Sequence, residues 1–231
     1  MIYTPPFVEW HMRRVSFAVY GALEEHMDIL LHIGPHTLTK KKLAAFRADG
    51  VPEVVLLYGQ HTGGLRVDWR ARGGVRLEGS INLLPVEQVY GPLHPDDFLV
   101  LPEDPPAVHH FRPVDRFKPD ACVGLIHDER RSPELYYYDE SDRDPVALDL
   151  DLQGYISLLQ FTWGFLNWQL LLLELVSPAG QARPFRLQPD SLASNSIGED
   201  LPLLAQQNPD WDLDAFVAHY DLVKLSAQPQ V

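Results

Sequence analysis

The sequence predicts an α+β fold in which helices flank an antiparallel sheet. Segments with helical spacing of apolar residues lie towards both ends of the chain, whereas residues 65–150 hold short runs of alternating or continuous apolar residues. Glycine, proline and aspartate separate these runs by links so short that antiparallel pairing is favoured. The chain has 231 residues, of which 45% are hydrophobic, so it can form a sizeable core.

Three helices are predicted before the first strand. Apolar residues recur at every third or fourth position over residues 10–33, and a glycine-proline pair ends this extra N-terminal helix. Thr39 can cap a short helix over residues 40–48, which ends at an aspartate-glycine pair. Pro52 suits the first position of a third helix, which extends to Tyr58.

The sheet is predicted from segments that alternate in polarity or are wholly apolar. Gly73 and Gly74 are typical of a hairpin turn between the first two of these segments. A helical turn is expected over residues 85–90, and the proline- and aspartate-rich stretch 91–106 is expected to be a loop with one short strand. The predicted strands cover residues 65–69, 75–77, 80–84, 98–101, 108–111, 122–127, 134–138 and 146–150.

An apolar helix over residues 152–176 is predicted to close a single domain of residues 1–177. A thin polar stripe along this helix indicates a buried amphipathic helix rather than a membrane span, because unpaired polar groups are costly in lipid. The composition then becomes polar and rich in proline. We therefore expect residues 178–231 to form a C-terminal extension with two weak helices, over 198–207 and 211–225.

The formal net charge of −13 argues against a surface that binds nucleic acid throughout, because phosphates would be repelled. Residues 86–151 carry 16 acidic and 6 basic side chains and therefore hold most of the excess negative charge. Such a region is either a solvated surface that aids solubility or a docking face for a cationic protein partner.

Other classes of protein are disfavoured by what the chain lacks. Cys122 is the only cysteine and lies in an apolar run, which favours a core thiol and excludes an intramolecular disulfide. The N-terminus has no basic region followed by an apolar run, so we expect no signal peptide and a cytoplasmic protein. Nucleophile, phosphate-loop and histidine metal motifs are missing, so we expect no enzymatic activity, cofactor or metal.

Two acidic loops and a tyrosine-rich strand supply the candidate binding residues. The tyrosines at 136–138 alternate between the faces of a predicted strand, so two can pack in the core while one serves as an exposed binding anchor. Ordinary cross-strand packing is the alternative. The predicted partner-binding residues are Asp96, Asp97, Glu103, Asp104, Tyr136, Tyr138, Asp139, Glu140, Asp142 and Asp144.

Several short motifs occur in a characteristic order. A proline-started helix and a glycine-rich turn occupy residues 51–64, and a strand that leads into a short helix occupies 79–89. An arginine-proline segment follows at 111–115, and a strand-helix unit at 148–169 ends in Gly-Phe-x-x-Trp-Gln. This order resembles the SUKH superfamily, which includes yeast cell-wall-synthesis regulators of the Smi/Knr type and many bacterial immunity proteins. The resemblance covers about residues 38–175.

The resemblance implies a SUKH-like α+β fold and a non-enzymatic binding protein, commonly an immunity protein that neutralises a toxin. Many such toxins are nucleases with cationic active sites, so an acidic face could dock there as a mimic of phosphate. An intracellular regulatory scaffold of the Smi/Knr type is the alternative. A hydrolase that uses His94 with Asp96 and Asp97 is a third hypothesis.

Overall fold

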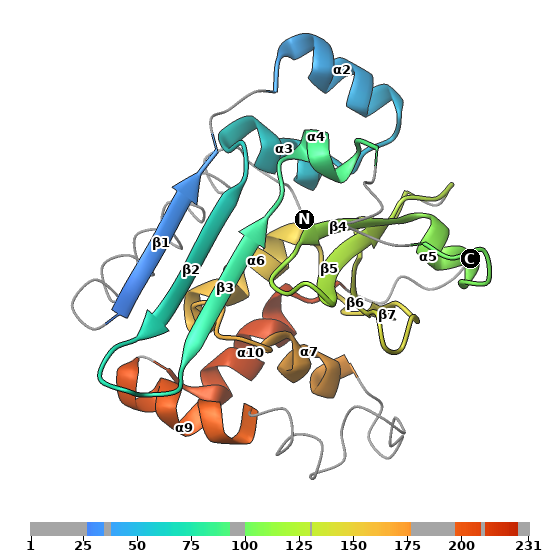
Figure 1. The fold of residues 1–231 in the computed structure, drawn as a ribbon. Coiled ribbons are helices and arrows are strands. Elements are labelled where there is room, and N and C mark those ends of the chain that lie inside the picture. The colour runs from blue at the N-terminus through green and yellow to red at the C-terminus, as the bar shows by residue number, and fades with distance from the viewer. Residues whose placement is uncertain are drawn as a thin grey trace.

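The strands form one antiparallel sheet in which neighbours along the chain are also neighbours in space (Figure 1). The computed structural model describes residues 27–34, 38–92, 100–129, 131–176, 197–208 and 211–225. Within these ranges the sheet has seven strands in the order β1-β2-β3-β4-β5-β6-β7, and every neighbouring pair is antiparallel. The predicted α+β class and antiparallel pairing are therefore confirmed.

Most of the described elements overlap a predicted segment. The strands are β1 Met27–Ile33, β2 Leu65–Ala71, β3 Glu78–Leu83, β4 Phe111–Asp115, β5 Ala121–Ile126, β6 Leu135–Asp139 and β7 Val146–Ala147. The helices are α2 Lys40–Ala48, α3 Glu53–His61, α4 Val86–Val89, α5 Pro106–His109, α6 Leu152–Thr162, α7 Gln169–Val176, α9 Ile197–Gln207 and α10 Leu213–Val223.

The sheet narrows to a single junction between β3 and β4, which divides it into two ribbons (Figure 1). β1 and β2 pair over seven residues and β2 and β3 over six, whereas β3 and β4 share the one ladder pair Leu83↔Asp115. Backbone N–H groups of Leu84 and Arg116 extend this contact with bonds of 2.8 and 3.0 Å across the junction. Asp115 therefore lies where the two ribbons meet.

Residues 27–33 form strand β1, so the predicted helix over 10–33 is wrong at its C-terminal end; residues 10–26 lie outside the described part of the chain. Ile29 and Leu31 pack against the core from one face of the strand. The apolar spacing of so short a segment fits both a helix and a strand. Pairing of all seven residues with β2 decides the outcome, a long-range contact that local spacing does not reveal.

The segment before β4 folds as a helical turn where a strand was predicted over 108–111. Pro105 precedes and Pro106 begins helix α5, since a fixed φ and a missing N–H suit the start of a helix. β4 begins only after this turn. The strand predicted over 98–101 is also wrong at its second half, and residues 98 and 99 lie outside the described ranges.

The connection between β2 and β3 is longer than predicted. Gly73 and Gly74 have φ values of +75° and +80°, a region that glycine enters without strain, and they form the predicted turn. Residues 75–77 form no strand, and the ladder with β2 resumes at Glu78. The predicted strands on either side are confirmed as β2 and β3.

The long helix predicted over 152–176 is broken into α6 and α7. Trp163 and Gly164 have φ values of +51° and +65°, which no helix continues. Backbone hydrogen bonds of 2.9 and 2.8 Å join the segment between the helices to Glu78 and Ser80 of β3. The break therefore satisfies backbone groups of β3 that β4 does not reach.

The main core lies between the sheet and the helices α6, α7, α9 and α10, which gather on one side of it (Figure 1), and it also includes buried side chains of α3 and α4. Phe216 of α10 packs edge-on against Trp168, with ring centroids 6.4 Å apart and planes at 90°. Both helices predicted in the C-terminal extension are confirmed, and they contribute to the same core as the sheet. Their fully buried apolar side chains are Leu204, Phe216 and Tyr220.

A smaller apolar cluster is formed by the side chains of β4, β5 and β6 that point away from the main core, together with α5. Cys122 belongs to it, and burial raises the pKa of this thiol well above its ordinary value, as expected for a core cysteine. Its buried members are Val108, Phe111, Cys122, Ile126 and Tyr138. Over the described ranges, no helix has the length and apolarity that a membrane crossing requires.

Candidate functional site

An ion pair joins the two acidic loops predicted to bind a partner. Arg143, in the turn after β6, donates through Nε and a terminal nitrogen to Oδ1 and Oδ2 of Asp104, at 2.5 and 2.6 Å. The backbone N–H of Leu101 also donates to Oδ2, at 2.6 Å. Because Asp104 and Arg143 are 39 positions apart, this bidentate pair holds the 100–104 loop beside the 139–144 turn.

The Asp104 carboxylate joins the two loops and is buried. Its side chain is 2% exposed, and the hydrogen bond from Arg143 holds the pKa of its carboxyl below the ordinary value. The same hydrogen bond raises the pKa of the Arg143 guanidinium. Both of its oxygens face the protein's own donors, and the predicted contact of Asp104 with a partner stays a prediction.

The other carboxylates of the described parts of the two loops, residues 100–104 and 139–144, are exposed or half-buried. Asp139 is half-buried, and its Oδ1 accepts from the backbone N–H of Ser141 at 2.8 Å, which shapes the turn. The remaining four carboxylates are exposed. We call Glu103, Asp139, Glu140, Asp142 and Asp144 the acidic surface.

The three consecutive tyrosines alternate between the two apolar clusters, and none is fully exposed. Tyr138 is 1% exposed and packs against Phe111, with ring centroids 5.4 Å apart, and its predicted contact with a partner stays a prediction. Tyr137 is buried in the main core. Tyr136 is half-buried and donates its hydroxyl to Oε2 of Glu134 at 2.9 Å, so it remains the candidate aromatic contact.

A buried polar network that sequence reasoning missed lies at the junction of the two ribbons. Asp115 accepts from the Tyr155 hydroxyl at 2.7 Å through Oδ2 and from the Asn82 backbone N–H at 2.8 Å through Oδ1. Nε2 of Gln169 donates to the Tyr155 hydroxyl at 3.0 Å. Burial raises the pKa of Asp115 to about 6. The network thereby connects β3, β4, α6 and α7.

This network stabilises the fold and is not accessible to a ligand. Asp115, Tyr155 and Gln169 each have 0% of their surface exposed, so solvent and solutes do not reach them. The signal in the sequence was an aspartate directly after the apolar pair Pro113-Val114. Only the fold shows that its partners are Tyr155 of α6, 40 positions away, and the backbone of Asn82 on β3, 33 positions away.

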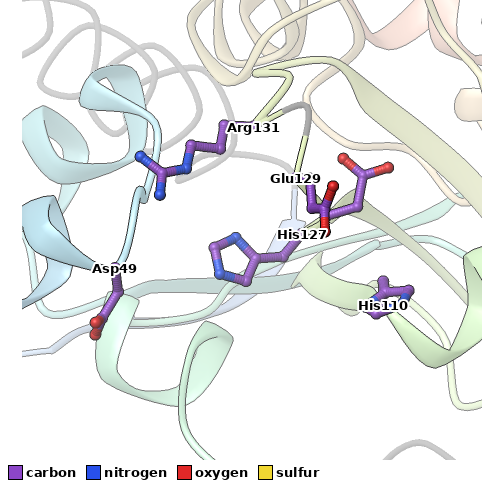
Figure 2. A pocket seen from close by; sticks show the side chains of 6 residues that line it. Asp49, His110, His127, Glu129 and Arg131 are labelled. Carbon is purple, nitrogen blue, oxygen red and sulfur yellow. The ribbon is translucent and has the colours of Figure 1, made fainter.

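An open cleft of about 660 Å³ lies where α2, α5 and β5 end. Figure 2 shows the His127 ring in the middle, with Arg131 and Asp49 to one side and His110 to the other. The His127 ring packs edge-on against Tyr90 at 5.0 Å between centroids, and burial is the main cause that lowers its pKa. The lining residues are Asp49, His110, His127, Asp128, Glu129 and Arg131.

The cleft mixes opposite charges and defines no reaction. Its lining holds imidazoles, carboxylates and one guanidinium but no serine, threonine, cysteine or lysine that would act as a nucleophile. The sequence did not indicate it, because its residues come from segments between 49 and 131 that only the fold brings together.

The remaining chemical hypotheses receive no support from the structure. His94, Asp96 and Asp97 lie outside the described residues, so the hydrolase hypothesis and the first two predicted contact residues stay predictions. In the part of the chain that the structure describes, no three histidine, cysteine, aspartate or glutamate side chains gather as a metal site. Comparisons with protein-family models, curated proteins and solved structures found no match.

Proposed function

We propose that the protein is a non-enzymatic binding protein that docks its acidic surface on a cationic protein. The observation that carries this proposal is the Asp104–Arg143 pair. It joins two loops distant in sequence, and it satisfies the one basic side chain of the 139–144 turn with a buried carboxylate. The exposed carboxylates of Glu103, Glu140, Asp142 and Asp144 lie around this pair and make the surface strongly acidic.

The charge of the turn supports fast association with a basic partner. Residues 139–144 hold four acidic side chains and one basic side chain, and Asp104 compensates the basic one. Clustered exposed carboxylates attract a cationic surface and raise the association rate, and dissolved salt weakens this attraction. The surface is therefore suited to bind quickly and to depend on ionic strength.

The partner we propose is a toxin with a cationic, nucleic-acid-binding active site, as for immunity proteins of the SUKH superfamily, which the order of motifs resembles. In that complex the exposed carboxylates would occupy positions of substrate phosphates. Tyr136, on the same strand as Asp139, would add aromatic contact area next to Glu134.

A matched pair of charge-reversal variants tests the proposal. The partner is first captured from a lysate of the native host on immobilised wild-type protein and then purified. The double variant Glu140→Lys/Asp142→Lys should bind this partner with an association rate at least about tenfold lower, and with a weaker dependence on salt. The control Asp214→Lys/Asp221→Lys makes the same change in net charge on exposed positions of α10 and should stay within about twofold of wild type.

Equal binding by wild type and the Glu140→Lys/Asp142→Lys variant at low salt would contradict the proposal. An equal loss in both double variants would show that net charge rather than this surface matters. A captured partner that is a cellular regulator instead of a toxin would favour the scaffold function of the Smi/Knr type.

A further inference from the structure

Strand β1 lies at the edge of the sheet, opposite in strand order to the β6–β7 end that carries the acidic surface. Among the described residues it pairs with β2 alone, so the backbone groups on its outer side have no ladder partner there. A seven-residue edge of this kind is a template for a further strand.

The side chains of β1 give this edge little protection, since Asp28 is its one acidic or basic side chain apart from His32. The strand contains no lysine and no proline, the residues that commonly block edge pairing. Leu30 and Ile33 are 59% and 53% exposed, and they are two of the four large exposed hydrophobic side chains among the described residues. Exposed apolar side chains on an unpaired edge indicate a surface that another strand covers.

We propose that β1 pairs antiparallel with β1 of a second copy of this chain, around a two-fold axis at Leu30. A two-fold axis perpendicular to the sheet keeps every side chain on its own face, so the axis must pass a residue that pairs with itself. Centring on Leu30 pairs all seven residues of the strand. Centring on Ile29 or Leu31 shortens the paired segment of the seven-residue strand by two residues.

The Leu30-centred register is also complementary in chemistry. It places Asp28 opposite His32 of the second copy, a carboxylate facing an imidazole, and it places the two exposed Leu30 side chains against each other. The Asp28 side chain is 80% exposed beside Arg72, so a second copy can reach it. On the other face Ile29 meets Leu31 and continues the apolar core across the interface.

This dimer does not rest on the proposed function, and it leaves the acidic surface accessible at the far end of each sheet. Failure of either proposal therefore leaves the other standing.

Disulfide trapping tests the register. In the Leu30→Cys variant the two introduced thiols face each other across the axis at about 5 Å between Cβ atoms, so mild oxidation should link most chains into dimers. Ile33→Cys is the matched control: its position is exposed to a similar degree, but its two copies would lie about 20 Å apart along the strands. The native Cys122 is buried and should not react.

Sedimentation equilibrium of the full chain provides the second measurement. Wild type should show twice the mass of one 26.2 kDa chain at micromolar concentrations. Leu30→Lys places two like charges on the axis and should shift the equilibrium to monomer, whereas Leu222→Lys, at a position 74% exposed on α10, should stay dimeric.

Two results would overturn the dimer. One is a wild-type mass of a single chain at concentrations up to about 0.1 mM, which is also expected if residues 1–26 or another protein cover the edge. The other is equal cross-linking of the Leu30→Cys and Ile33→Cys variants, which would indicate random collision.

Discussion

Two buried aspartates of this protein have opposite pKa shifts, because the Arg143 hydrogen bond dominates at Asp104 and burial dominates at Asp115. Asp104 accepts from the Arg143 guanidinium, and this lowers the pKa of its carboxyl. Asp115 accepts from a hydroxyl and a backbone amide, which are neutral, and burial raises its pKa to about 6. The two residues therefore respond to acid in opposite directions.

The Asp115→Asn variant should change how stability depends on pH. Since the folded-state pKa lies above the ordinary value of 3.8, the stabilising effect of protonation is fully present below about pH 4 and is lost as pH rises through about 6. Between pH 4 and 7 the wild type should therefore lose up to about 3 kcal/mol of unfolding free energy through Asp115. The variant lacks this titration and should not show this loss. Urea unfolding at several pH values measures this, and parallel pH profiles would contradict it.

The Arg143→Gln variant should show the reverse dependence. A lowered carboxyl pKa stabilises the fold above the ordinary Asp104 pKa, and this contribution is lost as pH falls through the folded value. The difference in unfolding free energy between wild type and variant should therefore shrink below about pH 4. The backbone N–H of Leu101, which shares the Asp104 carboxylate, should exchange with deuterium faster in the variant at neutral pH.

Arg66→Gln serves as the control for that experiment. Arg66 pairs with Asp68 at 2.7 Å on the exposed face of β2, where an ion pair contributes little. Its removal should leave both the Leu101 exchange rate and the pH profile as in wild type. If both variants changed the Leu101 exchange rate and the pH profile to a similar extent, these effects would not be specific to the Asp104–Arg143 pair.

At the scale of the elements, the sequence was sufficient where local patterns decide the outcome. Alternation identified β2 and β3, and Thr39 caps α2 as predicted, with its hydroxyl accepting from the backbone of Lys42 at 3.3 Å. At β1 and at the α6–α7 break the prediction was wrong because the deciding partner is distant in sequence. β1 is a strand because β2 pairs with it. The α6–α7 break forms because its backbone hydrogen-bonds to Glu78 and Ser80 of β3.

The α6–α7 break makes a specific demand on Gly164. Its φ is +65°, and an added Cβ would lie 2.3 Å from Cγ1 of the buried Ile81. The Gly164→Ala variant should therefore lose about 2–4 kcal/mol of unfolding free energy, from backbone strain and overpacking together. Gly73→Ala has a similar φ of +75° but nothing within 4 Å of an added Cβ, and should lose about 1 kcal/mol. Equal losses in urea unfolding would contradict this account.

The candidate site shows the same division between local and distant information. The cluster of carboxylates in the 139–144 turn could be predicted from composition alone. The ion pair of Asp104 with Arg143 and the burial of Tyr138 against Phe111 could not be predicted. Both depend on which loops and strand faces the fold brings together. The cleft around His127 was missed for the same reason.

At the scale of the whole molecule, the C-terminal helices complete the core. Phe216 of α10 contacts the rings of Phe161, Trp168 and Trp211, with centroids 5.8 to 6.4 Å apart. Asn208, which follows α9, donates its side-chain amide to the Phe161 carbonyl at 3.3 Å. The chain after residue 196 therefore covers apolar surface that α6 and α7 would otherwise expose.

The Phe216→Ala variant should lower the unfolding free energy of the whole protein by about 3–5 kcal/mol, because it removes a fully buried aromatic ring. Leu222→Ala on the same helix removes a side chain that is 74% exposed and should change it by less than about 0.5 kcal/mol. Fluorescence and far-ultraviolet circular dichroism during urea unfolding report both. An unaffected Phe216→Ala variant would show that α10 is not energetically part of the core.

The narrow β3–β4 junction has a consequence for cooperativity. A single ladder pair couples the two ribbons only weakly. On this contact alone, each ribbon would open as a separate unit in hydrogen exchange. The α6–α7 region contacts both ribbons: its backbone is bonded to Ser80 of β3, and Tyr155 is bonded to Asp115 of β4. These helices therefore couple the two ribbons, and the all-or-none character of unfolding depends on them more than on the sheet itself.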